Sequence, residues 1–417
     1  MLKLEAVVIH MEKIIEEVDF LVGEKSINIE ELLSLHSFEV FSDDTISFLS
    51  ELSNRLLKNP KSRKFPDVAT FAFYCRSANL SILKKTHHLT DQSLRLGRGI
   101  VFHITPGNVP VNFAYSLLAG LLMGNINIVK VPSKQFEQVN LIISSIKEIL
   151  QEEKYCKIFS KRLYIVRYER ESNATALFSG ISDVRIIWGG DHTINEIRKC
   201  SISPKSTEVT FSDRYSISVI DASGYLKAED KVKIAQGFYN DTYLFDQNAC
   251  TSPQTIYWLG LKAEVEKAKT IFWEMMQNIL EDKQFDLQPI LSIDKLTTFY
   301  AQAISYGDIK KEPQVTNEIW RVNNITIHAD IDLHKCSSGY FNEINISSLD
   351  ELKTIISRRY QTIGYFGIGE DEFKKWVIRC KPLGIDRIVP IGRTMDFSLF
   401  WDGYDLVSSL SRQILII

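Results

Sequence analysis

Between residues 99 and 221, short apolar runs rich in Val and Ile alternate with segments of helical character. The strand-like runs are GIVFHIT (99–105), INIVKVP (126–132), LYIVRYE (163–169), VRIIWGG (184–190) and YSISVID (215–221). They lack strict apolar–polar alternation, which indicates strands that are buried on both faces. Strands of this kind, separated by helices, predict an α/β fold with a parallel, doubly wound sheet of the dinucleotide-binding type.

The length of 417 residues exceeds what one hydrophobic core usually spans, so two domains are expected. Apolar residues at helical spacing, as in the opening LEAVVIHMEKIIEEVDFLV, predict a helical N-terminal region over 1–95. We expect the dinucleotide-binding domain over 96–222 and a second α/β domain, the catalytic one, over 223–395. The C-terminal segment 396–417 ends in an apolar run with no evident partner strand nearby, which predicts an oligomerisation strand and a homo-oligomer.

Composition and charge exclude several classes of function. The net charge is −3 and there is no long Lys/Arg block, which argues against a nucleic-acid partner. The longest nearly apolar stretch, 111–124, is shorter than the ~20 residues of a membrane span, and the N-terminus does not resemble a secretory signal. The six cysteines are far apart and show no metal-ligand spacing, so we predict no disulfides, no metal site and a cytoplasmic protein.

Cys250 lies in the polar stretch FDQNACTSPQ (245–254), directly before a strand-like run. A nucleophilic cysteine needs access to substrate and a partly polar setting, and the small neighbours Ala249 and Thr251 leave room beside the thiol. Because an isolated cysteine often packs as a small hydrophobe, a structural thiol is the alternative.

In a doubly wound sheet, ligands bind beyond the carboxyl ends of the strands, so the loops after residues 105, 132 and 190 are candidate sites. Asn108 could donate to an oxyanion or only satisfy turn backbone. Lys130 ends a strand, where it could bind phosphate or ribose, or extend into solvent. Gly189 and Gly190 could let the backbone approach a pyrophosphate, or only form a strand-to-helix turn.

A second glycine-rich stretch, GYFGIGED (364–371), is interpreted as a turn, because no strand–loop–helix context is evident around it.

Taken together, several motifs resemble the LuxC-type acyl-CoA reductases of the aldehyde dehydrogenase superfamily. The stretches that carry this resemblance are ITPGNVP, LLMGNINIVKVPS, IIWGGD, FDQNACTSPQ, YQTIGYFG and DRIVPIGR followed by WDGYD. They extend from about residue 65 to the C-terminus. The resemblance implies an aldehyde dehydrogenase-like fold, with a cofactor domain and a catalytic domain.

The resemblance also implies roles for individual residues. Cys250 matches the nucleophile of the family, and Asn108 matches the amide of the oxyanion hole, joined by the backbone N–H of Cys250. The cofactor-binding residues implied are Thr105, Lys130, Ser133, Gly189 and Gly190. Lys130 matches the lysine at the adenosine ribose, and the two glycines match the turn near the pyrophosphate.

Two departures from the superfamily pattern refine the expected reaction. Many NAD-preferring members have a Glu three residues after the lysine, whereas this chain has Ser133 followed by Lys134, which favours NADPH. Aldehyde-oxidising members have a catalytic Glu in a Glu-Leu-Gly-Gly motif, which the corresponding TEVTFSDRYS (207–216) lacks, although Glu208 is close. Hydrolysis of an acyl-enzyme needs an activated water, whereas exchange with a thiol does not, so the loss favours thioester chemistry.

The sequence therefore predicts an NADPH-dependent reductase that converts a long-chain acyl thioester, acyl-CoA or acyl-protein, to an aldehyde through an S-acyl Cys250. The resemblance implies an acyl-protein synthetase and an acyltransferase as partners. Two alternatives are an aldehyde dehydrogenase that works in the oxidising direction with Glu208 as base, and a non-catalytic scaffold subunit.

Overall fold

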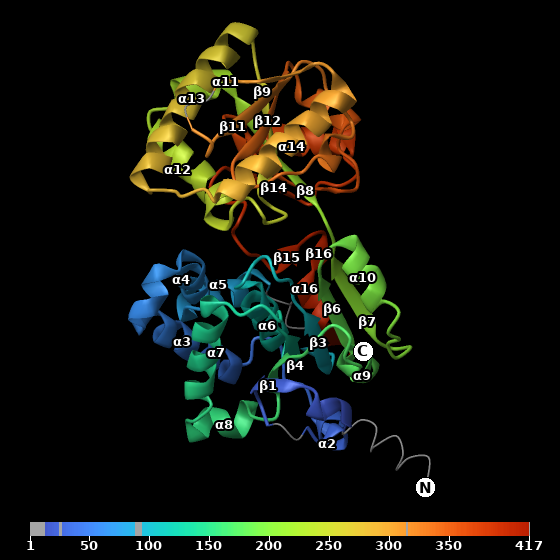
Figure 1. Cartoon of the computed structure of the whole chain (residues 1–417). Helices are drawn as coiled ribbons and strands as arrows, with labels where there is room; N and C mark the ends of the chain where they lie inside the picture. The colour runs from blue at the N-terminus through green and yellow to red at the C-terminus, as the bar shows by residue number, and fades with distance from the viewer. Residues whose placement is uncertain (1–12, 25–26, 88–93, 314–315, 417) are drawn as a thin grey trace. The chain divides into compact units, whose positions relative to one another are not determined.

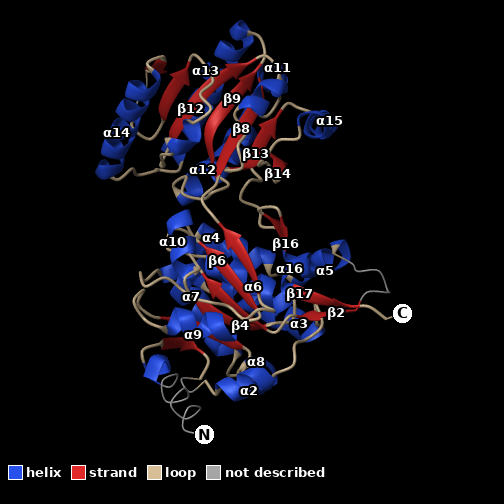
Figure 2. Ribbon diagram, turned by 90° about the vertical axis from the view of Figure 1, so that its right-hand side faces the viewer, coloured by secondary structure: helices blue, strands red, loops and turns tan. Residues whose placement is uncertain are grey.

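The computed structural model describes residues 13–24, 27–87, 94–313 and 316–416. The chain divides into two compact units, with boundaries between Ser212 and Asp213 and between Phe397 and Ser398 (Figure 1). In each unit, helices surround a central layer of strands (Figure 2). We call the unit that includes both chain ends unit 1, and the unit formed by residues 213–397 unit 2.

The sheet of unit 1 has six strands in the order β1-β5-β4-β3-β6-β7. All neighbours are parallel except β1, which is antiparallel to β5. The chain builds β3, β4 and β5 outward in one direction and then returns to place β6 and β7 on the other side of β3. The strands are β1 (Asp19–Val22), β3 (Ile100–Ile104), β4 (Ile126–Lys130), β5 (Leu163–Arg167), β6 (Val184–Trp188) and β7 (Thr207–Phe211).

Alternate side chains of these strands enter different packing layers. Ile100, Phe102 and Ile104 of β3 join one hydrophobic cluster with Leu177 and Phe178 of the helix α9 (Ala174–Ile181). The other helices of unit 1 are α2 (Ile29–Ser34), α3 (Asp43–Lys58), η1 (Pro60–Lys64), α4 (Pro66–Tyr74), α5 (Ser77–Thr86), α6 (Asn112–Leu122), α7 (Glu137–Ile149), α8 (Glu153–Phe159), α10 (Asp191–Ile197) and α16 (Leu406–Leu410).

Unit 2 has a seven-stranded sheet in the order β10-β11-β12-β9-β8-β13-β14, parallel except for β10. Its strands are β8 (Tyr215–Asp221), β9 (Pro253–Leu259), β10 (Ile309–Lys311), β11 (Trp320–Asn324), β12 (Tyr340–Ile346), β13 (Tyr360–Phe366) and β14 (Arg387–Pro390). Its helices are α11 (Ala222–Lys227), α12 (Lys231–Thr242), η2 (Tyr243–Phe245), α13 (Lys262–Asp282), α14 (Pro289–Tyr306), η3 (Ile331–Leu333), η4 (Leu349–Thr354) and α15 (Glu370–Cys380). An aromatic cluster that includes Phe238, Phe272 and Trp273 joins α12 and α13 to the sheet.

The five strands expected between residues 99 and 221 all form, but β8 is not part of the first sheet. It pairs with β9 and β13 in unit 2, so the boundary between the units falls at 212/213, whereas we expected 222/223. The strand pattern shows burial on both faces but does not encode which sheet provides the neighbours.

Three other local expectations are wrong. Residues 19–22 form the strand β1 and do not continue a helix, because they pair with β5. The stretch 364–371 is not an isolated turn, since it contains the end of β13, a loop and the start of α15. The tail has a partner in its own chain, because β17 (Ser411–Ile414) pairs antiparallel with β2 (Leu94–Gly97). The sequence argument for oligomerisation therefore loses its basis. In the same unit, β15 (Phe400–Trp401) pairs with β16 (Tyr404–Asp405).

A buried chain of hydrogen bonds crosses the centre of unit 1. The imidazole of His103 lies between the Ser116 hydroxyl, at 2.7 Å from Nδ1, and the Asn127 amide oxygen, at 3.0 Å from Nε2. Trp188 donates to the same serine at 3.0 Å. Burial lowers the pKa of His103 to about 4, so the ring is neutral and has a structural role here. Gly120 of α6 lies directly against Asn127, where a side chain would not fit.

Gly120→Ala is expected to lower the free energy of unfolding by about 1–3 kcal/mol, because the added methyl group overlaps the Asn127 amide. Gly180→Ala on α9 is the matched control. Nothing lies within 4 Å of the methyl group added there, so it should be neutral or stabilise by up to about 1 kcal/mol. Urea unfolding followed by circular dichroism measures both, and equal stability of the two variants would contradict the packing assigned to Gly120.

Candidate functional site

The carboxyl ends of β3, β4 and β6 lie at one edge of the unit 1 sheet, since these strands are parallel neighbours. The strand order reverses between β3 and β6, and a doubly wound sheet binds its ligand in the crevice at such a switch point. The predicted cofactor-binding residues all lie at the carboxyl ends of these three strands or in the loops after them. They are Thr105, Lys130, Ser133, Gly189 and Gly190.

Thr105 links the first two of these loops. Its hydroxyl donates to the carbonyl of Lys130 at 2.7 Å, and its backbone N–H donates to the same oxygen at 3.2 Å. The Lys130 ammonium lies 5.0 Å from the centre of the Tyr168 ring. Burial lowers the pKa of Lys130, and the charge of Glu169 opposes this effect. A cation is thus held against an aromatic face beside the switch point.

Ser133 and Lys134 are exposed beyond the end of β4, and a third polar residue, Arg167, lies beside them. Arg167 ends β5, and its Nε donates to the carbonyl of Pro132 at 3.1 Å. Its Nη2 atom is buried and has no hydrogen-bond partner among the described residues. Sequence reasoning missed Arg167, although its place at the end of a strand next to the Lys130 strand was a usable signal.

The two glycines lie where β6 meets α10. The N–H of Gly189 donates to the carbonyl of Phe211 at 3.1 Å, and Gly190 is the N-cap residue of α10. A Cβ atom on Gly189 would lie 3.2 Å from Thr193, closer than side chains normally pack. The turn thus needs a small residue for packing, and it also exposes backbone at the sheet edge. It is therefore compatible with both roles considered for the two glycines, a simple strand-to-helix turn and close approach of the backbone to a pyrophosphate.

Asn108 is exposed in the turn between β3 and α6. It belongs to unit 1, whereas Cys250 belongs to unit 2. The structure thus brings Asn108 to the same sheet edge as Thr105, and its shared role with Cys250 stays a prediction.

Cys250 is half-buried in the loop between η2 and β9. The loop begins with Asp246 and Gln247 in the left-handed region, at φ 49° and 60°, which non-glycine residues adopt only when their surroundings stabilise it. Ser216 of β8 donates to the carbonyl of Cys250 at 2.7 Å. The thiol is therefore carried by a backbone that is tied to the central strands.

Gln247 provides most of that attachment. Its side chain is fully buried, and its amide nitrogen donates to the carbonyls of Pro253, at 2.8 Å, and Tyr340, at 3.1 Å. Its amide oxygen accepts from the N–H groups of Gly339, at 3.0 Å, and Tyr340, at 3.2 Å. One amide thus uses its donors and its acceptor to join the Cys250 loop to β9 and β12. This role could not be predicted from local sequence, because it depends on residues that are 92 and 93 positions away along the chain.

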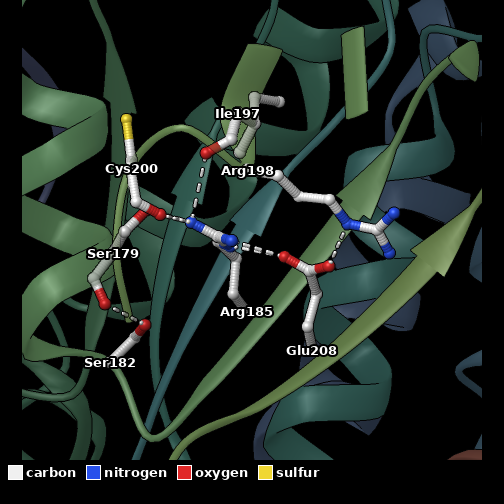
Figure 3. A network of polar contacts seen from close by, with 7 residues as sticks. All are labelled: Ser179, Ser182, Arg185, Ile197, Arg198, Cys200 and Glu208. Atoms are coloured by element: carbon white, nitrogen blue, oxygen red, sulfur yellow. Dashed lines mark hydrogen bonds and ion pairs between the residues drawn. The ribbon is translucent and has the colours of Figure 1, made fainter. Parts of the chain in front are cut away.

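Glu208, the alternative base, is engaged by two arginines (Figure 3). Its carboxylate accepts from Nε of the buried Arg185 at 2.9 Å and from Nε of Arg198 at 2.7 Å. Arg185 also donates to the carbonyls of Ile197 and Cys200, at 3.3 and 2.7 Å. A carboxylate whose oxygens both accept from guanidinium groups is held as a structural anion, and this arrangement disfavours proton abstraction from water.

No group of three or more His, Cys, Asp or Glu side chains in the described part of the chain is placed to hold a metal ion. Among the same residues, no helix has the length and hydropathy needed to cross a membrane.

The sequence profile of the acyl-CoA reductase (LuxC) family matches residues 79–413. The chain belongs to this family. Among its relatives is the long-chain acyl-protein thioester reductase of Aliivibrio fischeri, 28% identical over 181 residues, which are 42% of this chain and 36% of the relative. The enzyme of the same name from Vibrio harveyi is 25% identical over 321 residues, 73% of this chain and 62% of the relative. The chain thus covers about one third of the length of the first relative and about three fifths of the length of the second.

Solved structures of aldehyde dehydrogenases share the fold. The benzaldehyde dehydrogenase of Corynebacterium glutamicum aligns with a TM-score of 0.62 at 10% identity, covering 93% of this chain and 87% of that protein. The glyceraldehyde-3-phosphate dehydrogenase GapN of Methanocaldococcus jannaschii, solved in complex with NADP, aligns with a TM-score of 0.63 at 12% identity, covering 93% and 91%. The predicted family and the aldehyde dehydrogenase-like α/β fold are therefore confirmed.

Gln247→Glu is expected to destabilise the chain by about 2–4 kcal/mol, because a carboxylate cannot donate to the carbonyls of Pro253 and Tyr340 and would be buried. Hydrogen exchange of residues 245–254 should become faster at the same time. Gln284→Glu, the same change at an exposed position of unit 2, is the control and should alter neither quantity. If hydrogen exchange of residues 245–254 did not change in Gln247→Glu, the anchoring role of Gln247 would be contradicted.

Proposed function

We propose that the chain is a reductase that converts a long-chain acyl thioester to an aldehyde through an S-acyl intermediate on Cys250. The observation that carries this proposal is the half-buried Cys250 on a loop that is fixed to β8, β9 and β12, in a chain of the acyl-CoA reductase family. A nucleophile that is held in one position avoids the entropic cost of being ordered at each turnover.

In the proposed reaction, the Cys250 thiolate attacks the thioester carbonyl and the tetrahedral oxyanion accepts hydrogen bonds from Asn108 and from the backbone N–H of Cys250. Collapse of this species breaks the bond to the donor thiol, which leaves, and an S-acyl enzyme remains. Bound NADPH would supply a hydride to the acyl carbon. The carbon–sulfur bond of the resulting thiohemiacetal then breaks, which releases the aldehyde and restores Cys250.

The engagement of Glu208 favours reduction over the oxidising alternative. An aldehyde dehydrogenase must activate water to hydrolyse the acyl-enzyme. Glu208 accepts from two guanidinium groups, and the Glu-Leu-Gly-Gly motif is absent from its surroundings. Transfer of the acyl group from a thiol to Cys250 and its reduction require no such base.

NADPH is the proposed cofactor, held by Thr105, Lys130, Ser133, Gly189 and Gly190 at the switch point of unit 1. The residues fit this group, because the strand order is that of a dinucleotide-binding sheet and Arg167 has a buried Nη2 without a hydrogen-bond partner among the described residues. Together with Lys134, Arg167 makes the end of the crevice near Ser133 cationic. We infer that this end accepts the 2′-phosphate that distinguishes NADPH from NADH.

The acyl donor that we propose is acyl-CoA or an acyl-protein, the latter in keeping with the name of the Vibrio harveyi relative. An acyl-protein synthetase and an acyltransferase are the proposed partners.

The acyl-enzyme can be tested without the reductive step. Mixing the protein with a long-chain acyl-CoA in the absence of NADPH should place one acyl group on the Cys250 peptide, detected by mass spectrometry, and Cys250→Ala should abolish it. Cys156→Ser is the control, because Cys156 is exposed in unit 1 and should not affect labelling. An unlabelled Cys250, or aldehyde formation by Cys250→Ala at the wild-type rate, would refute the mechanism.

Arg167→Gln should raise the KM for NADPH about tenfold or more and leave the KM for NADH nearly unchanged, because it removes a charge-assisted bond to the 2′-phosphate. Steady-state NAD(P)H oxidation measures both constants. Arg170→Gln, an exposed cation three residues further, is the control. Equal effects on the two cofactors would assign Arg167 a structural role instead.

A further inference from the structure

The segment 391–397, which follows β14, packs against the Cys250 loop. The Thr251 hydroxyl donates to the sulfur of Met395 at 3.2 Å, and the Ser252 hydroxyl lies 3.9 Å from the same sulfur. Both residues are buried and directly follow Cys250. Met395 therefore fixes one side of the loop that carries the thiol.

Arg387, the first residue of β14, contacts the backbone on both sides of Met395. Its Nη1 donates to the carbonyl of Thr394 at 3.1 Å and its Nη2 to the carbonyl of Asp396 at 2.9 Å. These carbonyls flank Met395, so the planar guanidinium sets the position of the methionine backbone.

Asp241 of α12 holds the segment from the other side. Its carboxylate accepts from the N–H groups of Gly392, at 2.6 Å, and Thr394, at 3.0 Å. Burial raises the pKa of Asp241 to about 7, against the effect of these two donors. The segment is thus fixed by the side chains of Arg387 and Asp241, which come from two different elements.

The charge of an ionised Cys250 acts on Arg387. Burial lowers the pKa of Arg387, whereas the negative charges of Asp396, ionised Cys250 and Asp241 raise it. Arg393 is a second cation, and its charge lowers the pKa of Arg387. The Nε of Arg393 pairs with Asp396 at 2.8 Å. Because the interaction of two charges is mutual, a guanidinium that is stabilised by the Cys250 thiolate also favours the thiolate.

We propose that Arg387 is a positioning residue of the Cys250 site, which holds Met395 against the nucleophile loop and supplies the positive charge that favours the Cys250 thiolate. This inference rests on the proposed nucleophilic role of Cys250. It assigns the deprotonation of Cys250 to a fixed cation and requires no neighbouring base.

The test is the rate of alkylation of Cys250 by iodoacetamide as a function of pH, measured on the full chain by peptide mass spectrometry. Arg387→Gln should raise the pH of half-maximal alkylation by about one unit, which is about a tenfold slower reaction at neutral pH. Arg387→Lys keeps the charge and should restore most of this shift. The exposed Cys156, in the same samples, should show one unchanged profile throughout.

A second variant predicts a change in the opposite direction. Asp396 is exposed, and it accepts from Arg387 through its backbone carbonyl, so Asp396→Asn keeps this bond, should fold normally and removes a competing negative charge. The pH of half-maximal alkylation should then fall. The proposal would be overturned if the pH profile of Cys250 alkylation were unchanged both in Asp396→Asn and in folded Arg387→Gln. It would also be overturned if Arg387→Lys did not restore the reactivity of Cys250.

Alkylation needs neither acyl donor nor cofactor, so it is independent of the acyl-transfer experiment. Loss of acyl labelling with the alkylation shifts intact would refute the proposed function and leave the role of Arg387 in thiolate formation standing. Normal acyl labelling without the shifts would refute the role of Arg387 alone.

Discussion

The amide of Gln247 is the interaction on which the arrangement around Cys250 depends. The chain leaves α12 and must turn sharply to enter β9 at the centre of a seven-stranded sheet. Two consecutive residues in the left-handed region make that turn, and four hydrogen bonds of one buried side chain stabilise it. A reactive loop can be held rigidly at little cost only when its buried polar groups are all satisfied.

Buried polar side chains with several partners also fix other parts of both units. Glu343 in the centre of β12 is fully buried, and its carboxylate accepts from two indole N–H groups, those of Trp258 and Trp273, and from Arg321. Arg185 joins β6 and β7 through Glu208 and holds the end of α10 through two carbonyls. Removing one partner would leave an unpaired charge in the low-dielectric interior, which is strongly unfavourable. Such clusters therefore favour the one arrangement of the surrounding strands that keeps all partners in place.

Most of the doubly wound region could be predicted, because buried parallel strands have continuous apolar runs that alternate with segments of helical character. The predicted cofactor residues follow parallel strands, and this alone is enough to bring Thr105, Lys130 and Gly189 to one edge. The state of Glu208 could not be predicted, since one of its partners, Arg185, lies 23 residues away on a neighbouring strand. Arg387 shows the same limit, because its position near Met395 depends on how the chain folds back after β14.

The sequence by itself determined the family, the parallel, doubly wound character of the first sheet and the polar loop that carries Cys250. These features depend on local patterns, namely which residues are apolar, where helices begin and end, and which motifs follow one another. Only the tertiary structure decided that β8 joins the second sheet, that β17 pairs with β2, that Glu208 is held by two arginines and that Gln247 anchors the nucleophile loop. Each of these depends on pairing between segments distant in the chain, and the free energy that selects one partner over another comes from burial and hydrogen bonding that no local pattern contains.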